Sequence, residues 1–273
     1  MTGFRGNSRL QKIIYCSPAP EPDEANVQNE DVLARIHMDA VLSNFEILTR
    51  EDAEAFSIAK GWNGSILFMA GMKGPRATLE MKHGVVKVLP GKAGKPDIIL
   101  FFPTVRILNN LFTGAGSGFP IPLKGLLKAG GLKVFSKLAK RMETILKGVN
   151  PPREIKARLL INTVGKAIAA IAASEPESQI IARGIRGVAE VRIKNDEAVN
   201  ITFSGQDVTA RNGRVTDPDL VMEFATKDLF LDIVDDRVDV FAAICLEDIR
   251  VEGDLHMGEA MNLFLDKVGI YLQ

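Results

Sequence analysis

The order of apolar and polar positions predicts helices first and strands after them. Across 32–48 the apolar residues fall at helical spacing. Thr49, followed by acidic residues, predicts the first turn of a second helix that ends near Gly61. Alternating segments then predict strands at 65–70, 77–81 and 85–89. The uninterrupted apolar run 98–102 predicts a strand buried on both faces, with Thr104 capping a short helix behind it.

A second series with the same order follows. Asn150, Pro151 and Pro152 end one helix and begin another, which marks a boundary. Beyond it the pattern predicts helices at 154–173 and 176–185 and strands at 188–193, 199–203, 207–210 and 220–224. Thr226 is predicted to cap a short helix after the last of these, and an edge strand at 249–251 and a closing helix at 260–272 follow.

One motif occurs in both series. Residues 96–104 read PDIILFFPT, and 218–226 read PDLVMEFAT, without gaps. A period this long indicates a duplicated domain rather than a solenoid unit. We therefore expect an extended or disordered leader at 1–29, a first domain at 30–149 and a second at 150–273.

Composition narrows the class. A chain that is 46% hydrophobic and 25% charged is typical of soluble proteins, and no segment approaches the ~20 uncharged apolar residues of a membrane span. Two distant cysteines, Cys16 and Cys245, argue against a disulfide framework. With no convincing targeting segment, we expect a cytoplasmic protein.

The net charge of zero results from two segments of opposite charge. Residues 104–158 carry eleven Lys and Arg against two Glu, and 217–254 carry twelve Asp and Glu against three Lys and Arg. These surfaces either attract each other in an intramolecular pseudo-dimer, or face different partners, or are solvated faces that diverged after duplication. Nucleic acid is disfavoured, because no basic groove with interleaved aromatic residues is present.

The order of elements resembles the sterol carrier protein type-2 family. The resemblance is carried in the first copy by 64–89, with its turn at His83-Gly84, and by 97–104. In the second copy 187–210, 219–226 and 251–255 carry it. It implies an α+β sandwich in which a mostly antiparallel five-stranded sheet is covered by helices, twice in tandem. It also implies an apolar tunnel for a fatty acyl chain, a sterol-like lipid or an isoprenoid, without catalytic residues or cofactor.

Apolar residues near the matched strands are the tunnel candidates, although core and pocket look alike in sequence. In the first copy they are Leu100, Phe102, Leu108, Phe112, Phe119, Leu126, Val134 and Leu138. In the second they are Met222, Phe224, Phe230, Met257, Met261 and Phe264. If one copy alone binds lipid, we favour the first, because its Gly/Pro-rich segment 113–131 offers a rim at 114–122.

The remaining candidates concern surfaces and chemistry. The helix at 133–147 carries Lys133, Lys137, Lys140 and Arg141 beside an apolar stripe; it either rests transiently on an anionic membrane or packs on its own sheet. His37, His83 and His256 belong to no metal or catalytic motif. We therefore expect no enzymatic activity and no metal. The alternative to a lipid carrier is a non-binding scaffold or accessory subunit that recruits a protein partner through its charged faces.

Overall fold

The computed structural model describes residues 29–114, 118–125 and 129–272. They form two compact units, 29–163 and 164–272. The helix that follows the predicted boundary at Asn150 runs from one unit into the other, so the units divide inside it.

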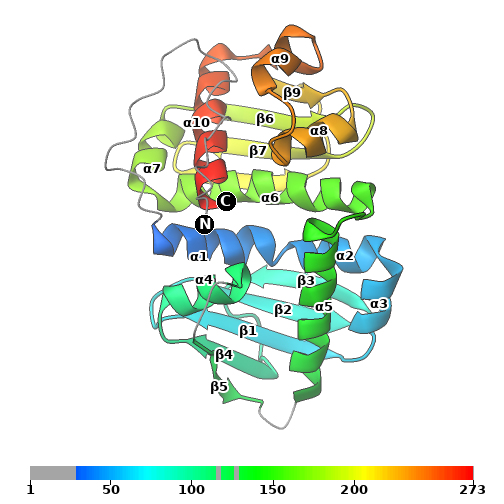
Figure 1. The fold of residues 1–273 in the computed structure, drawn as a ribbon. Helices are drawn as coiled ribbons and strands as arrows, with labels where there is room; N and C mark the ends of the chain where they lie inside the picture. Colours follow the sequence, from blue (N-terminus) through cyan, green and yellow to red (C-terminus); the bar gives the residue numbers. More distant parts are fainter. Residues whose placement is uncertain (1–28, 115–117, 126–128, 273) are drawn as a thin grey trace, which may run out of the picture. The chain divides into compact units, whose positions relative to one another are not determined.

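The first unit places four short helical segments ahead of its sheet. They are α1 (Glu30–Ile36), the π-helical turn η2 (His37–Val41), α2 (Asn44–Glu51) and α3 (Ala53–Ala59). The strands are β1 (Gly64–Ala70), β2 (Arg76–Lys82), β3 (Val85–Pro90), β4 (Ile98–Phe102) and β5 (Ile121–Lys124). The later helices are α4 (Val105–Thr113), α5 (Ala129–Lys147) and the start of α6 (Arg153–Ser174). Figure 1 shows α4 and α5 lying across one face of the sheet.

The second unit repeats this order after the remainder of α6. Its elements are α7 (Pro176–Arg183), β6 (Arg186–Ile193), β7 (Ala198–Ser204), β8 (Asp207–Asn212), β9 (Leu220–Phe224), α8 (Lys227–Val234), α9 (Val240–Cys245), β10 (Ile249–Gly253) and α10 (Leu255–Tyr271). In Figure 1, α8 and α10 lie over this second sheet.

Both sheets are mixed, which corrects the expectation of mostly antiparallel sheets. The strand orders are β3-β2-β1-β4-β5 and β10-β9-β6-β7-β8. In each, the chain runs outward through three antiparallel strands and then returns to the other side of the first one. The central pairs β1–β4 and β6–β9 are therefore parallel. The α+β class and the pair of five-stranded sheets are confirmed.

The repeated motif builds this central parallel pair. Asp97 Oδ2 accepts from the Ser65 backbone N–H at 3.0 Å, and Asp219 Oδ2 accepts from that of Val188 at 2.7 Å. At the other end of the motif, Thr104 and Thr226 cap α4 and α8 through their side-chain oxygens, as predicted. The shared residues therefore fix where each parallel strand begins and where the next helix starts.

One local expectation is wrong, and two elements were missed. Thr49 does not open the second helix; it lies buried within α2, where its hydroxyl bonds the Phe45 carbonyl and the Val86 backbone N–H. The cap of α3 is Asp52, which accepts from Ala55 N–H at 2.8 Å. The strand β5 and the short helix α9 were not predicted. Their segments are rich in Gly and Pro or in Asp, and such compositions indicate loops.

The strand β4 is buried on one face only, contrary to the prediction. Ile98, Leu100 and Phe102 join one apolar cluster with the helices, whereas Ile99 and Phe101 are half-buried and lie outside that cluster. Alternation along a strand puts the two sets on opposite faces of the sheet. We call the face that bears Ile99 and Phe101, opposite the helices, the open face.

Helix α6 meets the length and composition expected of a membrane-crossing helix, a feature that the sequence analysis did not recognise. It is the one such helix among the described residues, and most of its apolar window is buried within the protein. A core helix meets the same criterion, so this is weak evidence for a membrane span.

The turn before α10 generates a stability prediction. Gly253 has φ +120°, and a Cβ there would lie 2.1 Å from the Asp219 carbonyl oxygen. Gly205 has φ +72° but open space around it. We expect Gly253→Ala to lower the free energy of unfolding by more than about 3 kcal/mol, because backbone must move, and Gly205→Ala by about 1 kcal/mol. Urea denaturation measures both, and equal losses would contradict this close approach.

Candidate functional site

The candidate site is the apolar interior between each sheet and its helices. In the first unit, Leu100, Phe102, Leu108 and Leu138 are buried and belong to a single cluster. Phe112 and Val134 are partly buried and pack against its edge. The structure therefore brings together six of the eight residues predicted there.

Two predicted residues of the first copy do not join them. Phe119 is 87% exposed, so it is no part of an interior wall, and the prediction for this residue is wrong. The described residues that follow it, Ile121–Lys124, form the outer strand β5 of the sheet. Leu126 lies outside the described residues.

Aromatic side chains form the centre of this interior. The Phe68 ring centroid lies 5.3 Å from that of Phe135 and 6.4 Å from that of Phe102. Phe135 also contacts Phe45, with centroids 5.3 Å apart. Sequence reasoning did not place Phe45 or Phe68 in the site, although both occupy apolar positions of its predicted elements. The interior is thus lined by rings from helices and sheet.

The second unit gathers all six of its predicted residues in its interior. Met222, Phe224, Phe230, Met257, Met261 and Phe264 are each at most 6% exposed. Phe224 meets Phe230 edge to face at 5.2 Å, and Phe264 stacks on Phe203 at 5.8 Å. Thioethers next to aromatic rings form an adaptable wall.

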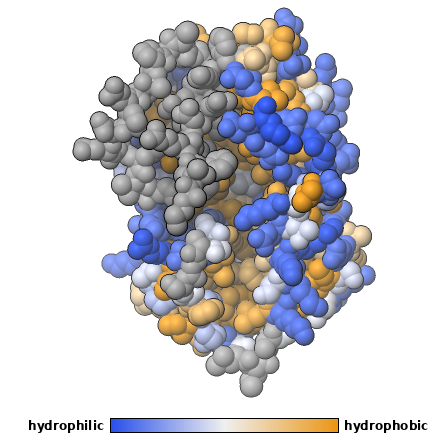
Figure 2. All heavy atoms as spheres, viewed as in Figure 1, coloured by the Kyte–Doolittle hydropathy of each residue, from blue (hydrophilic) through white to orange (hydrophobic). Residues whose placement is uncertain are grey.

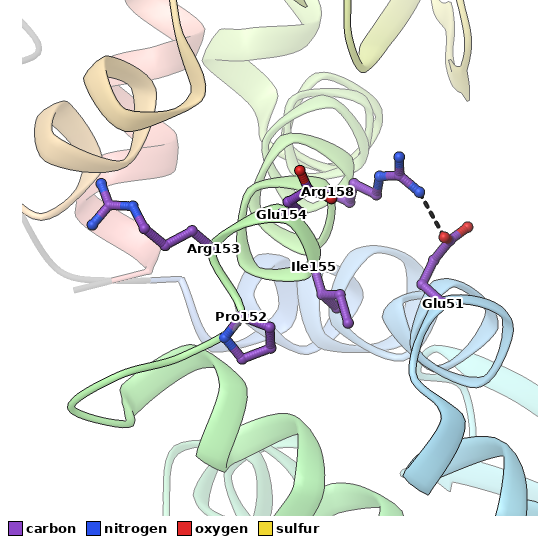
Figure 3. A pocket seen from close by; sticks show the side chains of 6 residues that line it. All are labelled: Glu51, Pro152, Arg153, Glu154, Ile155 and Arg158. Atoms are coloured by element: carbon purple, nitrogen blue, oxygen red, sulfur yellow. Dashed lines mark hydrogen bonds and ion pairs between the residues drawn. The ribbon is translucent and has the colours of Figure 1, made fainter.

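A cavity of about 260 Å³ lies elsewhere in the first unit, where α6 begins. Figure 3 shows its lining residues: Glu51, Pro152, Arg153, Glu154, Ile155 and Arg158. An ion pair of 2.6 Å joins Arg158 to Glu51 at its wall. No predicted tunnel residue lines it. Its charged lining suits a small polar group rather than an acyl chain.

A series of hydrogen bonds between polar side chains links η2, α4 and α1 at one side of the first interior. His37 Nδ1 lies 3.0 Å from Asn109 Oδ1, and Asn109 donates to Glu30 Oε2 at 2.6 Å. The His37 ring stacks on Phe112 at 4.9 Å. Burial lowers the pKa of His37 to about 4, so the imidazole is neutral near pH 7. His37 therefore has a structural role and holds α4 against the first helices.

The basic helix α5, for which contact with a membrane surface was one of the two predictions, packs its apolar stripe into the core of the first unit. Leu138, Met142 and Ile145 belong to the core cluster, while Lys133, Lys137 and Lys140 are exposed. Figure 2 shows hydrophilic side chains along this helix. Arg141 instead binds Asp52 at 2.7 Å and Glu54 at 3.0 Å, and its hydrogen bond lowers the pKa of Asp52. The helix thus offers only charge to a membrane, and a membrane role for it stays a prediction.

Buried acceptors on α10 are a polar feature that sequence reasoning missed. Asn262 and Asp266, one turn apart, are 9% and 7% exposed, and the Oδ1 atom of each has no hydrogen-bond partner among the described residues. Burial raises the pKa of Asp266 to about 7. No group of three or more potential metal ligands occurs within 29–114, 118–125 and 129–272.

The solved structures that resemble this protein each match about 40% of the chain, which is the length of one copy. No protein-family model and no curated protein matches this chain. Similar solved structures include "UbiJ-SCP2 Ubiquinone synthesis protein", at 16% identity and TM-score 0.31, covering 41% of this chain and 93% of that one. Another is apo sterol carrier protein 2 from Yarrowia lipolytica, at 12% identity and TM-score 0.31, covering 40% and 91%.

A third similar structure is the palmitated SCP2L2 of Aedes aegypti, at 17% identity and TM-score 0.29, covering 39% of this chain and 90% of that one. These structures belong to the class that the sequence analysis names, which confirms the predicted resemblance. At such identities the likeness concerns the fold alone.

The neutral His37 predicts acid sensitivity. Its folded pKa of about 4 lies below the ordinary value of 6.5, so the unfolded chain takes up a proton first as the pH falls. Stability is therefore lost between pH 6.5 and 4, by about 3 kcal/mol from this group. We expect His37→Gln to flatten the dependence of unfolding free energy on pH across that window in urea titrations. An unchanged slope would refute the assignment.

Asp266 on α10 makes stability depend on pH in the opposite direction. The folded pKa of Asp266, about 7, lies above its ordinary value of 3.8, so the unfolded chain loses the proton first and stability falls as the pH rises from about 4 to 7. We expect Asp266→Asn to raise the free energy of unfolding at pH 8 by at least about 1 kcal/mol, with a smaller gain at pH 5. Thermal melts at both values test this, and a loss at pH 8 would contradict it.

Proposed function

We propose that this protein is a non-enzymatic, cytoplasmic lipid carrier. It holds a fatty acyl chain, a sterol-like lipid or an isoprenoid in the apolar interior of at least one unit. Burial of about 0.8 kcal/mol per CH₂ gives a tail of twelve or more carbons roughly micromolar affinity after the costs of association. No titratable pair or cofactor takes part in this function.

One observation carries the proposal. The first interior is a continuous apolar and aromatic cluster between sheet and helices, and two of the buried polar side chains of this unit, His37 and Asn109, bond each other at one side. Partly buried apolar residues at its edge, among them Phe112 and Val134, are the side chains that an entering lipid tail would displace. A site of this kind is mostly apolar with few, well-placed polar groups.

The second candidate is a packed scaffold or accessory subunit. Near-complete burial of the predicted tunnel residues favours it, because closely packed side chains leave no room for a ligand unless the helices shift. In that case the apolar interior serves stability only, and a protein partner binds the charged faces.

Matched positions in the repeat provide the test. Leu100 and Met222 occupy the same place in the two motifs and are both buried. We expect native mass spectrometry of the purified protein to show about one bound lipid per chain. Leu100→Phe fills the first interior and should reduce the occupied fraction at least about five-fold, whereas Met222→Phe should leave it unchanged.

Melting temperatures show whether each variant folds, since overpacking costs about 1–3 kcal/mol. Loss of lipid in Met222→Phe alone would assign binding to the second unit. An apo mass for the wild type, unchanged after incubation with fatty acids and sterols, would support the scaffold.

A further inference from the structure

The open face of the first sheet is apolar along three strands. Met69 on β1, Ile99 and Phe101 on β4 and Ile121 on β5 share this face by register, and the three from β1 and β4 are partly buried and lie outside the core cluster. Leu67 on β1 points to the same face but is only 1% exposed, so it supports the patch from below. Ile121 is 47% exposed, and next to it along the chain Phe119 and Leu123 are 87% and 58% exposed. We call Met69, Ile99, Phe101, Phe119, Ile121 and Leu123 the apolar patch.

The second unit shows that the fold does not need this patch. By register, Leu67, Met69, Phe101 and Ile121 correspond to Glu190, Arg192, Glu223 and Arg250. There Arg192 binds Glu190 at 3.1 Å and Glu223 at 2.6 Å. The same strand positions are therefore apolar in one copy and ionic in the other. Since the same architecture forms either way, the apolar character of the first copy calls for another explanation.

Lysines surround the patch. Lys82 and Lys87 lie on the open face at the β2–β3 side, and Lys82 pairs with Glu80 at 3.4 Å. The loop after β3, which bonds Thr78 on this face, carries the exposed Lys92 and Lys95. On β5 the exposed Lys124 stands opposite Ile99 and donates to the Pro96 carbonyl.

We propose that the open face of the first unit docks on an anionic lipid bilayer. Phe119, Ile121 and Leu123 enter the interface between headgroups and acyl chains, and the surrounding lysines bind lipid phosphates. Partition of this kind combines buried apolar area with attraction of Lys to anionic lipid. This surface differs from α5, whose apolar stripe is buried, and it does not depend on a lipid held inside the protein.

Vesicle co-sedimentation tests the proposal. The full chain is mixed with vesicles of phosphatidylcholine alone and with vesicles that contain about one third phosphatidylglycerol. We expect the wild type to bind the anionic vesicles and to bind more weakly in high salt. Phe119→Ser combined with Leu123→Ser should reduce the partition constant at least about ten-fold, because both side chains are exposed and each loses burial in the interface.

Leu246→Ser is the matched control, since Leu246 is 72% exposed but lies in the second unit. It should bind as the wild type does, and circular dichroism should show all three proteins equally folded. Vesicle binding that is absent in the wild type, unchanged in the double variant or equally reduced in Leu246→Ser would overturn the proposal. So would a wild-type dimer by light scattering that the double variant abolishes, because a second copy would then cover the patch. Lipid content measured by native mass spectrometry tests the carrier function separately.

Discussion

The register of each sheet depends on one carboxylate. Asp97 and Asp219 each receive the backbone N–H of a residue near the start of the neighbouring strand and return a backbone bond to the same residue. This two-sided contact fixes where the parallel strand begins, and a slip of one residue would exchange its core and open faces. The burial of Phe102 and Phe224, and the place where α4 and α8 start, follow from that register.

Much of the fold could be predicted from the sequence because the same order of helices and strands, with the same motif, occurs twice in the chain. The strands β4 and β9 were predicted with their exact limits, and Thr104 and Thr226 were recognised as helix caps. The parallel central pair was not recognised, because strand order depends on a long-range return of the chain and periodicity describes only local structure. Thr49 and Asp52 are both good cap residues, and tertiary contacts with Val86 and Arg141 decide between them.

The candidate site was harder to predict than the fold. Phe102 and Phe119 look equivalent as apolar residues near the matched strand, yet Phe102 is fully buried and Phe119 is largely exposed to solvent. The run at β4 was interpreted as buried on both sides because every residue in it is apolar. Its alternation becomes visible only beside β9, where Glu223 replaces Phe101. Buried polar groups such as Asn262 and Asp266 carry no periodic signal at all.

The outer strand β5 has a consequence for solubility. An exposed edge strand with apolar side chains normally invites other chains to add to the sheet. Here Pro122 lacks a backbone N–H, and the register with β4 shifts beside Leu123, which has no direct partner. Both features interrupt the row of donors and acceptors that an incoming strand would need. The protein thereby presents Ile121 and Leu123 at its surface while resisting edge-to-edge polymerisation.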